Sequence, residues 1–298
     1  MNVSGIFPAL TTPYQQDGSV AVDHFKANLA RYNKTGLAGY VVLGSTGESV
    51  LLSFAESEAL LVAGKEAAAP GKLLIAGTGA ESTAETIART KRAATLGYDL
   101  ALVKTPYYYK PAYNPETYLR HYRAVADASP IPILLYSVPI FTGVTLETPE
   151  IVALAQHPNI IGIKDSSGTI QRIVEVAAQA PKHFQILTGS AGVLHPALAS
   201  GARGAILALA SALPEKCVEL FELFKNARHA EAQSLQQHLA LTSKAIVSEG
   251  GIAAVKYAMD LRGYHGGQPR LPLLPLADTK KAHIAQVISQ FEPASARA

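Results

Sequence analysis

The fold is decided by a stretch of ten residues, 159–168, that reads NIIGIKDSSG. Its first half is a run of branched and small apolar residues, which is typical of a buried parallel strand. The run ends at Lys164, and a short polar turn follows. Lysine is rarely buried without a partner or a chemical role. At the end of an apolar strand it either extends its head to solvent, or it loses hydration and supplies the neutral amine that attacks carbonyl groups.

The rest of the chain repeats a strand followed by a helix. We expect strands at residues 5–11, 39–43, 73–76, 100–103, 132–136, 160–164, 185–188 and 204–209. We expect helices between them at residues 23–34, 54–68, 83–96, 115–128, 149–156, 170–179 and 194–200. Strands that alternate with helices of this length predict parallel βα units, and eight such units predict a (β/α)8 TIM barrel of the α/β class.

Past residue 212 the pattern is helical only. Four further helices are expected, at residues 214–226, 230–247, 251–262 and 278–291, which is too much for one barrel helix. We therefore predict a barrel core over residues 1–212, whose last helix continues to about 226, and a C-terminal helical domain over residues 227–298.

Composition narrows the class of partner and the compartment. The chain has 298 residues, is 48% hydrophobic and carries a net charge of +3 without a block of lysine and arginine, so neither nucleic acid nor an anionic membrane is expected. No apolar run is long enough to span a bilayer. Because the N-terminus leads directly into an expected strand, we expect no signal peptide. The single Cys217 indicates a reducing, cytoplasmic compartment and a buried, inert thiol.

Active sites of such barrels lie at the carboxyl ends of the strands. Glycines and hydroxyl side chains dominate there: GSTGE at 44–48, KTPYYY at 104–109, YSVP at 136–139 and GSAG at 189–192. The nine histidines show no metal-ligand spacing, and paired carboxylates, a dinucleotide loop and a Walker A loop are missing. We therefore expect no metal or organic cofactor. An amine, hydroxyls and backbone N–H groups suit a substrate with a carbonyl and a carboxylate.

Several of these residues have two readings. The loop at 44–48 either cradles an anion with its backbone N–H groups or is an ordinary turn. Tyr136 is either core or a proton relay. The aromatic loop at 107–109 suits a subunit interface as well as a site. Lys104 is either a contact for an acidic substrate or an exposed cation.

Four motifs, in this order, carry a resemblance that covers nearly the whole chain. They are GSTGE (44–48), TPYY (105–108), LYSVP followed by TG (135–139 and 142–143) and GIKD (162–165). Together they resemble the dihydrodipicolinate synthase / N-acetylneuraminate lyase superfamily of class I aldolases. The resemblance implies a TIM barrel with a C-terminal helical domain, usually assembled as a homotetramer, a dimer of dimers.

The resemblance also implies roles for single residues. Lys164 would form a Schiff base with pyruvate, Ser45 and Thr46 would hold its carboxylate, and Tyr136 would shuttle protons. Tyr108 would reach into the neighbouring subunit's site and complete a relay with Ser45 and Tyr136. Gly189 and Ile206 match positions that line the pyruvate pocket in this superfamily.

The branch within the superfamily depends on Phe141. Dihydrodipicolinate synthases usually carry an arginine at this position, which binds the carboxylate of the aldehyde substrate. Phenylalanine cannot replace that contact, which is typically worth about 1.5–3 kcal/mol. Several segments resemble 4-hydroxy-2-oxoglutarate aldolase instead and imply Ser166 as a further substrate contact; they are LYSVP (135–139), QHPNI (156–160), KDS (164–166), GSAG (189–192) and GYHGG (263–267).

The sequence therefore predicts an enzyme that cleaves 4-hydroxy-2-oxoglutarate to pyruvate and glyoxylate. The alternative within the superfamily is 4-hydroxy-tetrahydrodipicolinate (dihydrodipicolinate) synthase, which condenses pyruvate with aspartate semialdehyde in lysine biosynthesis. Two other classes stay open: a phosphosugar barrel that binds phosphate at 189–192, and a barrel that binds without catalysis.

Overall fold

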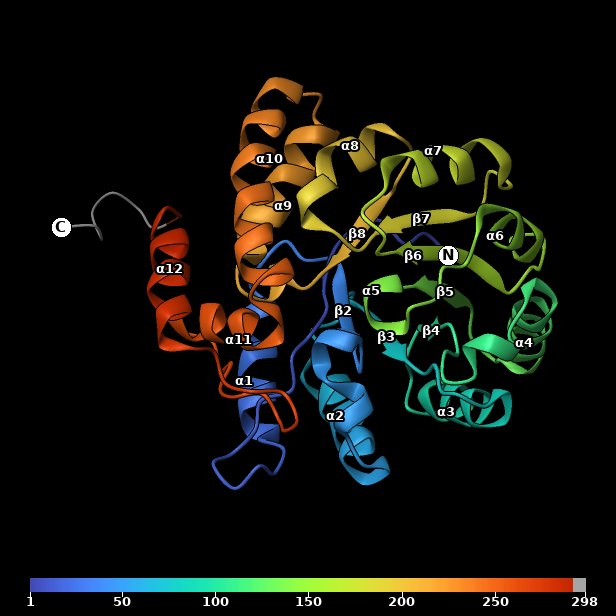
Figure 1. Ribbon diagram of the computed structural model, residues 1–298, viewed down its shortest axis with the longest axis horizontal. Coiled ribbons are helices and arrows are strands. Elements are labelled where there is room, and N and C mark those ends of the chain that lie inside the picture. The colour runs from blue at the N-terminus through green and yellow to red at the C-terminus, as the bar shows by residue number, and fades with distance from the viewer. Residues whose placement is uncertain (292–298) are drawn as a thin grey trace.

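Eight parallel strands form the centre of the computed structural model, which describes residues 1–291 (Figure 1). The strands are β1 (Gly5–Pro8), β2 (Gly39–Val42), β3 (Leu73–Gly77), β4 (Leu100–Lys104), β5 (Ile133–Ser137), β6 (Ile160–Asp165), β7 (Gln185–Thr188) and β8 (Gly204–Leu207). From β2 to β8 each strand pairs with the next one in sequence, and β1 pairs with β8. A bridge between Ala9 and Val41 joins the end of β1 to β2. The predicted barrel is therefore present, with β1 and β8 shorter than expected.

The predicted helices surround the strands. Around the barrel lie α1 (Val22–Tyr32), α2 (Phe54–Ala67), α3 (Thr83–Thr95), α4 (Pro115–Ala128), α6 (Thr148–Leu154), α7 (Ile170–Gln179) and α8 (Leu194–Ala199). They are followed by α9 (Pro214–Lys225), α10 (His229–Ser243), α11 (Gly251–Leu261) and α12 (Asp278–Ser289). Local sequence explains where α2 begins. The Ser53 hydroxyl accepts from the Glu56 N–H, and the Glu56 carboxylate accepts from the Ser53 N–H.

Two helical turns differ from the prediction. The short α5 (Pro139–Thr142) follows β5, with proline at its first turn and Gly143 in the left-handed region just after it. This arrangement of proline and glycine is a known helix signal that the sequence does carry. The second difference lies in the helix that is expected to run to residue 247. Its α-helical part, α10, ends at Ser243, and a π-helical turn, η6 (Lys244–Ser248), follows. Such turns are uncommon and often occur at functional sites.

The barrel interior is filled by large apolar side chains below its carboxyl end. Phe7, Val41, Ile75, Leu134 and Ile206 are fully buried there. Because this stack closes the interior, a ligand can enter only from the carboxyl ends of the strands. The fold therefore directs the strand-end residues toward one opening.

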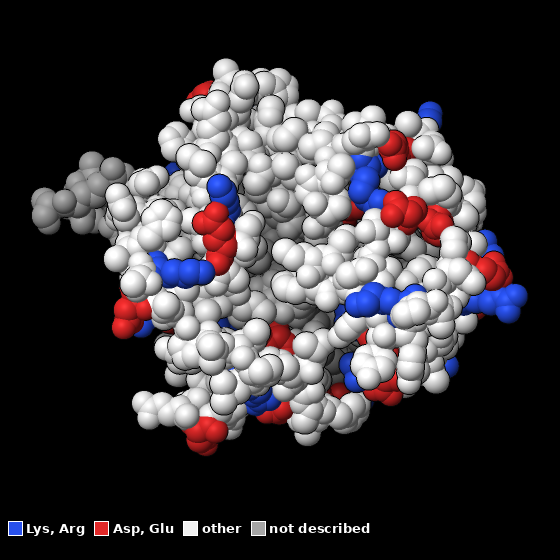
Figure 2. All heavy atoms as spheres, in the orientation of Figure 1, with Lys and Arg blue, Asp and Glu red and all other residues white. Residues whose placement is uncertain are grey.

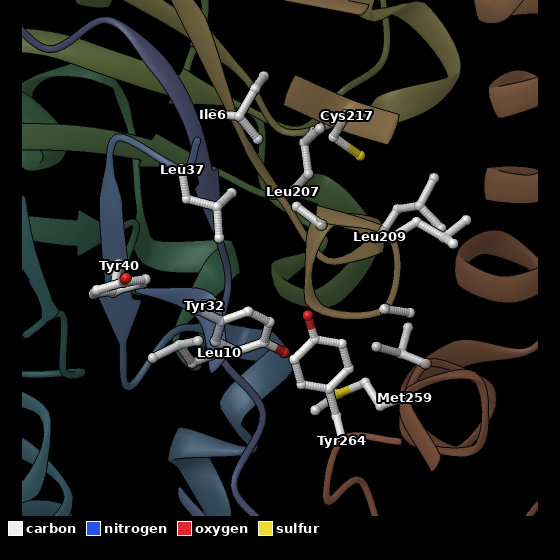
Figure 3. Close-up of a cluster of buried hydrophobic side chains, with 14 of the residues drawn as sticks. Ile6, Leu10, Tyr32, Leu37, Tyr40, Leu207, Leu209, Cys217, Met259 and Tyr264 are labelled. Carbon is white, nitrogen blue, oxygen red and sulfur yellow. The ribbon is translucent and has the colours of Figure 1, made fainter. Parts of the chain in front are cut away.

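The C-terminal helices pack against the β1–β8 side of the barrel. Figure 3 shows Tyr32 of α1 and Tyr264, which follows α11, pointing toward each other, with Met259 and Cys217 in the same cluster; the two tyrosine rings stack at 4.7 Å. Cys217 on α9 is fully buried, as predicted, and burial raises the pKa of its thiol to about 12. The domain boundary at residue 227 stays a prediction, and residues 292–298 of the predicted C-terminal domain lie outside the described residues.

Candidate active site

Three strand-end residues lie side by side in one row of the barrel. In the strand register Lys104 of β4 pairs with Tyr136 of β5, and Tyr136 pairs with Lys164 of β6. Side chains alternate between the two faces of a strand. Since Leu102 and Leu134, two residues earlier, belong to the barrel interior, this row faces the opening as well. Two amines and one phenol thus line the mouth of the barrel.

Lys164 is buried, with only 4% of its surface exposed. Its Nζ lies 4.1 Å from the centre of the Tyr136 ring. The neighbouring carboxylate, Asp165, is engaged elsewhere: its Oδ2 accepts from Arg172 Nε at 3.0 Å, and its Oδ1 accepts from the Ser167 N–H at 2.8 Å. Within residues 1–291 no carboxylate forms an ion pair with Lys164. The lysine therefore does not extend to solvent, and its nitrogen faces the opening.

Tyr136 connects this row to the loop after β2. The Tyr136 hydroxyl lies 3.3 Å from Ser45 Oγ, and either oxygen can donate. Ser45 begins a 3-10 turn, η1 (Ser45–Gly47), directly after β2. Lys164, Tyr136 and Ser45 are thus contiguous, and their roles as an amine and a proton relay stay a prediction.

The loop after β2 is held from two sides. The Thr12 hydroxyl donates to the Gly47 carbonyl at 2.6 Å, on the side of β1. On the other side, Glu48 Oε1 pairs with Lys256 Nζ of α11 at 2.5 Å, and both side chains are fully buried. Glu48 Oε2 accepts from the Arg270 N–H at 2.8 Å. The C-terminal segment therefore fixes the loop that carries Ser45 and Thr46.

A cavity of about 160 Å³ opens above Lys164. This is smaller than the ~300–1,000 Å³ of pockets for drug-sized ligands, and it suits a small organic acid. Its walls include the substrate-binding positions expected from the sequence, apart from Ser45; they are Thr46, Ser166, Gly189 and Ile206. The expected catalytic residues Lys164 and Tyr136 line it as well. Ser45 lines two adjoining pockets instead.

Glycine at position 189 has a steric cause. A Cβ atom added there would lie 1.8 Å from Ser166 Oγ. Any side chain would therefore displace Ser166 from the cavity wall. The Gly189 N–H also donates to the Asp165 carbonyl at 2.6 Å, which ties the end of β7 to β6.

Sequence reasoning missed the side of the cavity that the C-terminal helices supply. Val247 and Ser248 of the η6 turn, and Ile252 and Val255 of α11, line it. Nothing in their residue types indicates a ligand. The signal that the sequence did carry is the pair Gly250–Gly251, since Gly251 has φ +65° and opens α11 beside the cavity.

Tyr108 lies apart from the cavity within one chain. It is 71% exposed, and its ring meets that of Tyr109 edge-on at 5.0 Å. Its backbone N–H donates to Glu81 Oε2 at 2.8 Å, which fixes the loop but not the phenol. A single chain therefore does not bring Tyr108 to Ser45 and Tyr136, and its role in a neighbouring subunit stays a prediction.

Lys104 is not an exposed cation, so one of its two readings is wrong. Only 14% of its side chain is exposed, and burial lowers its pKa, with Glu81 opposing that effect. The sequence could not show this, because its strand-end position leaves open whether the side chain is covered. In the folded barrel Tyr107 and Glu81 lie beside the Lys104 amine.

The distribution of charged residues on the surface agrees with the small net charge of the sequence. Figure 2 shows basic and acidic residues interspersed on the face it presents, without a continuous basic patch. In the described part of the chain no three histidine, cysteine or acidic residues gather so that they could hold a metal ion. None of the helices described is long and apolar enough to cross a membrane.

Comparison with known proteins places the chain. The sequence pattern of the dihydrodipicolinate synthetase family matches residues 2–291. This chain belongs to the dihydrodipicolinate synthetase family. The resemblance predicted from the four motifs is confirmed, and the protein is an enzyme of the lyase and aldolase type found in this family.

Two relatives of this dihydrodipicolinate synthetase family member are named for different activities. A 4-hydroxy-tetrahydrodipicolinate synthase of Exiguobacterium sp. is 36% identical over 97% of this chain and 98% of its own length. A protein named probable 4-hydroxy-2-oxoglutarate aldolase, mitochondrial, of Emericella nidulans is 40% identical over 73% of this chain and 70% of its own. A crystal structure of a family member from E. coli K12 in complex with pyruvate has a TM-score of 0.92 at 27% identity, over 97% of this chain and 99% of that one. The predicted fold is confirmed.

Proposed function

We propose that this enzyme is a class I aldolase that forms a Schiff base at Lys164 and cleaves 4-hydroxy-2-oxoglutarate to pyruvate and glyoxylate. The observation that supports it is a buried amine in a small cavity, 4.1 Å from the ring of Tyr136, whose hydroxyl reaches Ser45. An amine beside a phenol and a serine supplies both a nucleophile for a carbonyl and a route for protons.

The proposed reaction begins with attack of neutral Lys164 on the keto carbon, C2. Loss of water gives an iminium, which draws the electrons of the C3–C4 bond as that bond breaks and leaves an enamine on the lysine. Tyr136 takes the proton of the C4 hydroxyl as glyoxylate departs, in relay with Ser45. Protonation of the enamine at C3 and hydrolysis of the iminium then release pyruvate and the free lysine.

The remaining cavity residues would hold the oxo acid in place. We assign the carboxylate next to the keto group to the hydroxyls of Ser45 and Thr46 and to backbone N–H groups of that loop. Gly189 and Ile206 would form the wall behind the pyruvyl carbons, and Ser166 would contact the substrate across from them. The family member solved in complex with pyruvate supports a 2-oxo acid as the ligand.

The choice of substrate depends on Phe141, which lines the cavity. A phenylalanine offers no charge for the carboxylate of aspartate semialdehyde. The Emericella nidulans relative, named for the aldolase, supports the same reading. The second candidate is 4-hydroxy-tetrahydrodipicolinate synthase, which is favoured by the name of a relative that covers 97% of the chain.

Borohydride trapping tests the proposed chemistry. Reduction in the presence of pyruvate is expected to add a stable mass to the peptide that contains Lys164, and Lys164→Arg is expected to lose both the adduct and the cleavage. Lys104→Met serves as the matched control, because it removes the other amine of the same row. An adduct on Lys104, or none at all, would contradict the assignment.

The rates of the two candidate reactions then test which substrate the enzyme prefers. The value of kcat/KM for cleavage of 4-hydroxy-2-oxoglutarate is compared with that for condensation of pyruvate and aspartate semialdehyde. We expect cleavage to dominate. If condensation is faster and the Lys164 adduct still forms, the second candidate function is the correct one. The Schiff-base proposal is then unaffected.

We also propose that the protein assembles as a homotetramer, a dimer of dimers, in a reducing, cytoplasmic compartment. Two neighbouring aromatic side chains, Tyr108 and Tyr109, are largely exposed on one loop, which suits a subunit contact. The single, buried Cys217 supports the compartment.

A further inference from the structure

Lys104 is a largely covered cation, with 14% of its side chain exposed, that the proposed reaction does not use. It ends β4 and lies next to Tyr136, on the side opposite Lys164. Lysine is seldom buried without a counter-charge or a ligand, because the loss of hydration is costly. The surroundings of Lys104 therefore have to account for its position.

The only ion pair of Lys104 within residues 1–291 leaves it incompletely satisfied. Its Nζ lies 3.7 Å from Glu81 Oε1, well beyond the 2.7–2.9 Å that is typical of a charge-assisted hydrogen bond. The other carboxylate oxygen of Glu81, Oε2, accepts hydrogen bonds from the backbone N–H groups of Tyr107 at 3.0 Å and Tyr108 at 2.8 Å. The ring of Tyr107 lies 5.1 Å from Nζ. An ammonium has three donors, so capacity remains for a second acceptor.

Lys104 lines a second cavity, of about 220 Å³, which adjoins the cavity above Lys164. Its walls are mainly apolar, and Lys104 is the only cation among the described residues that line it. The one carboxylate there, Glu48, is already paired with Lys256. This cavity shares Val138, Phe141 and Ile252 with the cavity above Lys164. A ligand attached to Lys164 could thus extend toward Lys104 past shared walls.

We propose that Lys104 binds the far carboxylate of the substrate, so that this site selects oxo acids with a second negative charge. The inference rests on the proposed function, since it places the keto carbon on Lys164. The two lysines are two strand spacings apart, about 10 Å at their backbones. A Schiff-base bond, three carbon–carbon bonds, a carboxylate and a hydrogen bond together span roughly 8 Å. That span is comparable to the spacing of the two backbones, so a five-carbon oxo diacid is long enough to extend from Lys164 toward Lys104. Lys104 would then supply the charge that Phe141 lacks.

A purely structural role for Lys104 makes a different prediction. In that case its task is to hold Glu81, and through it the backbone of Tyr107 and Tyr108. Loss of Lys104 would then impair every substrate alike, and loss of the Glu81 charge would have the same effect. A role in binding the far carboxylate affects only substrates that carry it.

The test compares two substrates that differ only at the far end. These are 4-hydroxy-2-oxoglutarate and 4-hydroxy-2-oxopentanoate, in which a methyl group replaces the far carboxylate and cleavage yields acetaldehyde in place of glyoxylate. We expect Lys104→Met to lower kcat/KM for the diacid by about 10- to 100-fold, the range of one charge-assisted hydrogen bond. For the methyl analogue we expect a change of less than about 3-fold. Lys104→Arg keeps the charge and is expected to retain most of the preference.

Glu81→Gln is the matched control, because it removes the partner of Lys104 and leaves the amine. We expect it to preserve the preference for the diacid. Equal losses on both substrates in Lys104→Met, or no loss on either, would overturn the inference. If Lys104→Met does not fold, borohydride trapping of the wild type with 2-oxoglutarate and 2-oxopentanoate decides it: half-saturation at least about 10-fold lower for 2-oxoglutarate is expected, and equal values refute the role of Lys104.

The two proposals fail in distinguishable ways. Without a pyruvate adduct on Lys164 in the wild type, the proposed function fails. With that adduct present and both substrates equally affected by Lys104→Met, only the assignment of the far carboxylate fails.

Discussion

A single residue, Phe141, sets the expected boundary between the two named activities. Its side chain lines both cavities, and more than half of it is exposed, so a longer polar side chain has room there. We predict that Phe141→Arg raises kcat/KM for condensation of pyruvate with aspartate semialdehyde by about 10- to 100-fold, because a guanidinium can pair with the aldehyde's carboxylate. Phe141→Met, of similar volume and without charge, should leave condensation nearly unchanged. A similar gain in both variants would show that the effect is one of space.

Residues of the site were predictable where chemistry and strand position coincide. Lys164 and Tyr136 lie at the ends of apolar strands, Ser45 follows one, and the ends of parallel strands meet at one opening. The burial of Lys104 was not predictable, because it depends on Glu81 and Tyr107, which reach it only in the folded barrel. Strand position alone cannot distinguish a covered lysine from one that extends to solvent.

Among the elements, α11 has a structural task that the sequence did not show. Its Lys256 and the Glu48 of the loop after β2 form a fully buried ion pair at 2.5 Å, and Lys256 also donates to the Gln268 carbonyl at 2.9 Å. Removing one partner of a buried pair leaves an uncompensated charge, which costs about 3–5 kcal/mol. We predict that Lys256→Met lowers the free energy of unfolding by this amount and weakens substrate binding, because the loop also carries Ser45 and Thr46.

Urea unfolding at one fixed protein concentration measures the effect, since assembly also contributes to apparent stability. Glu48→Gln should cost a similar amount, and the double variant Glu48→Gln/Lys256→Met should cost less than the sum of the two, because no unpaired charge is left. Additive losses would mean that the two side chains act independently, and the role assigned to α11 would then be wrong.

Elements marked by local signals were predicted well, and those set by distant packing were not. The start of α2 follows from Ser53 and Glu56, which satisfy each other's backbone groups within four residues. The π-helical turn η6 has no comparable signal, since the apolar pattern of residues 244–248 continues that of α10. Helical period does not distinguish an α-helical from a π-helical turn, yet this turn places Val247 and Ser248 over the site.

At the scale of the whole molecule, the barrel followed from the strand and helix alternation, but the closure of its site did not. The alternation is a local pattern that repeats along the chain, so it survives without knowledge of packing. The cavity wall from η6 and α11 depends on where the C-terminal helices dock, which is determined by contacts such as Tyr32 with Tyr264 and Glu48 with Lys256. Those partners are more than 200 positions apart in the sequence.

Assembly leads to the last prediction, which concerns Tyr108. In one chain its phenol is exposed and does not line the cavity above Lys164, although its backbone is fixed by Glu81. If Tyr108 completes the relay of a neighbouring subunit, Tyr108→Phe should lower kcat about 100-fold or more. Each active site would then combine Lys164 from one chain with Tyr108 from another.

Mixing two defective variants tests this arrangement directly. Tyr108→Phe and Lys164→Arg are unfolded together in equal amounts, refolded and assayed. Half of the resulting dimers pair one chain of each kind, and in these one site receives an intact Lys164 and an intact Tyr108. Activity should therefore recover to about a quarter of the wild-type value. The matched mixture of Tyr109→Phe with Lys164→Arg should give only the sum of its parts, because Tyr109→Phe alone is expected to stay active. If the first mixture shows no recovery, the relay lies within one chain, and the exposed phenol of Tyr108 serves contact between subunits only.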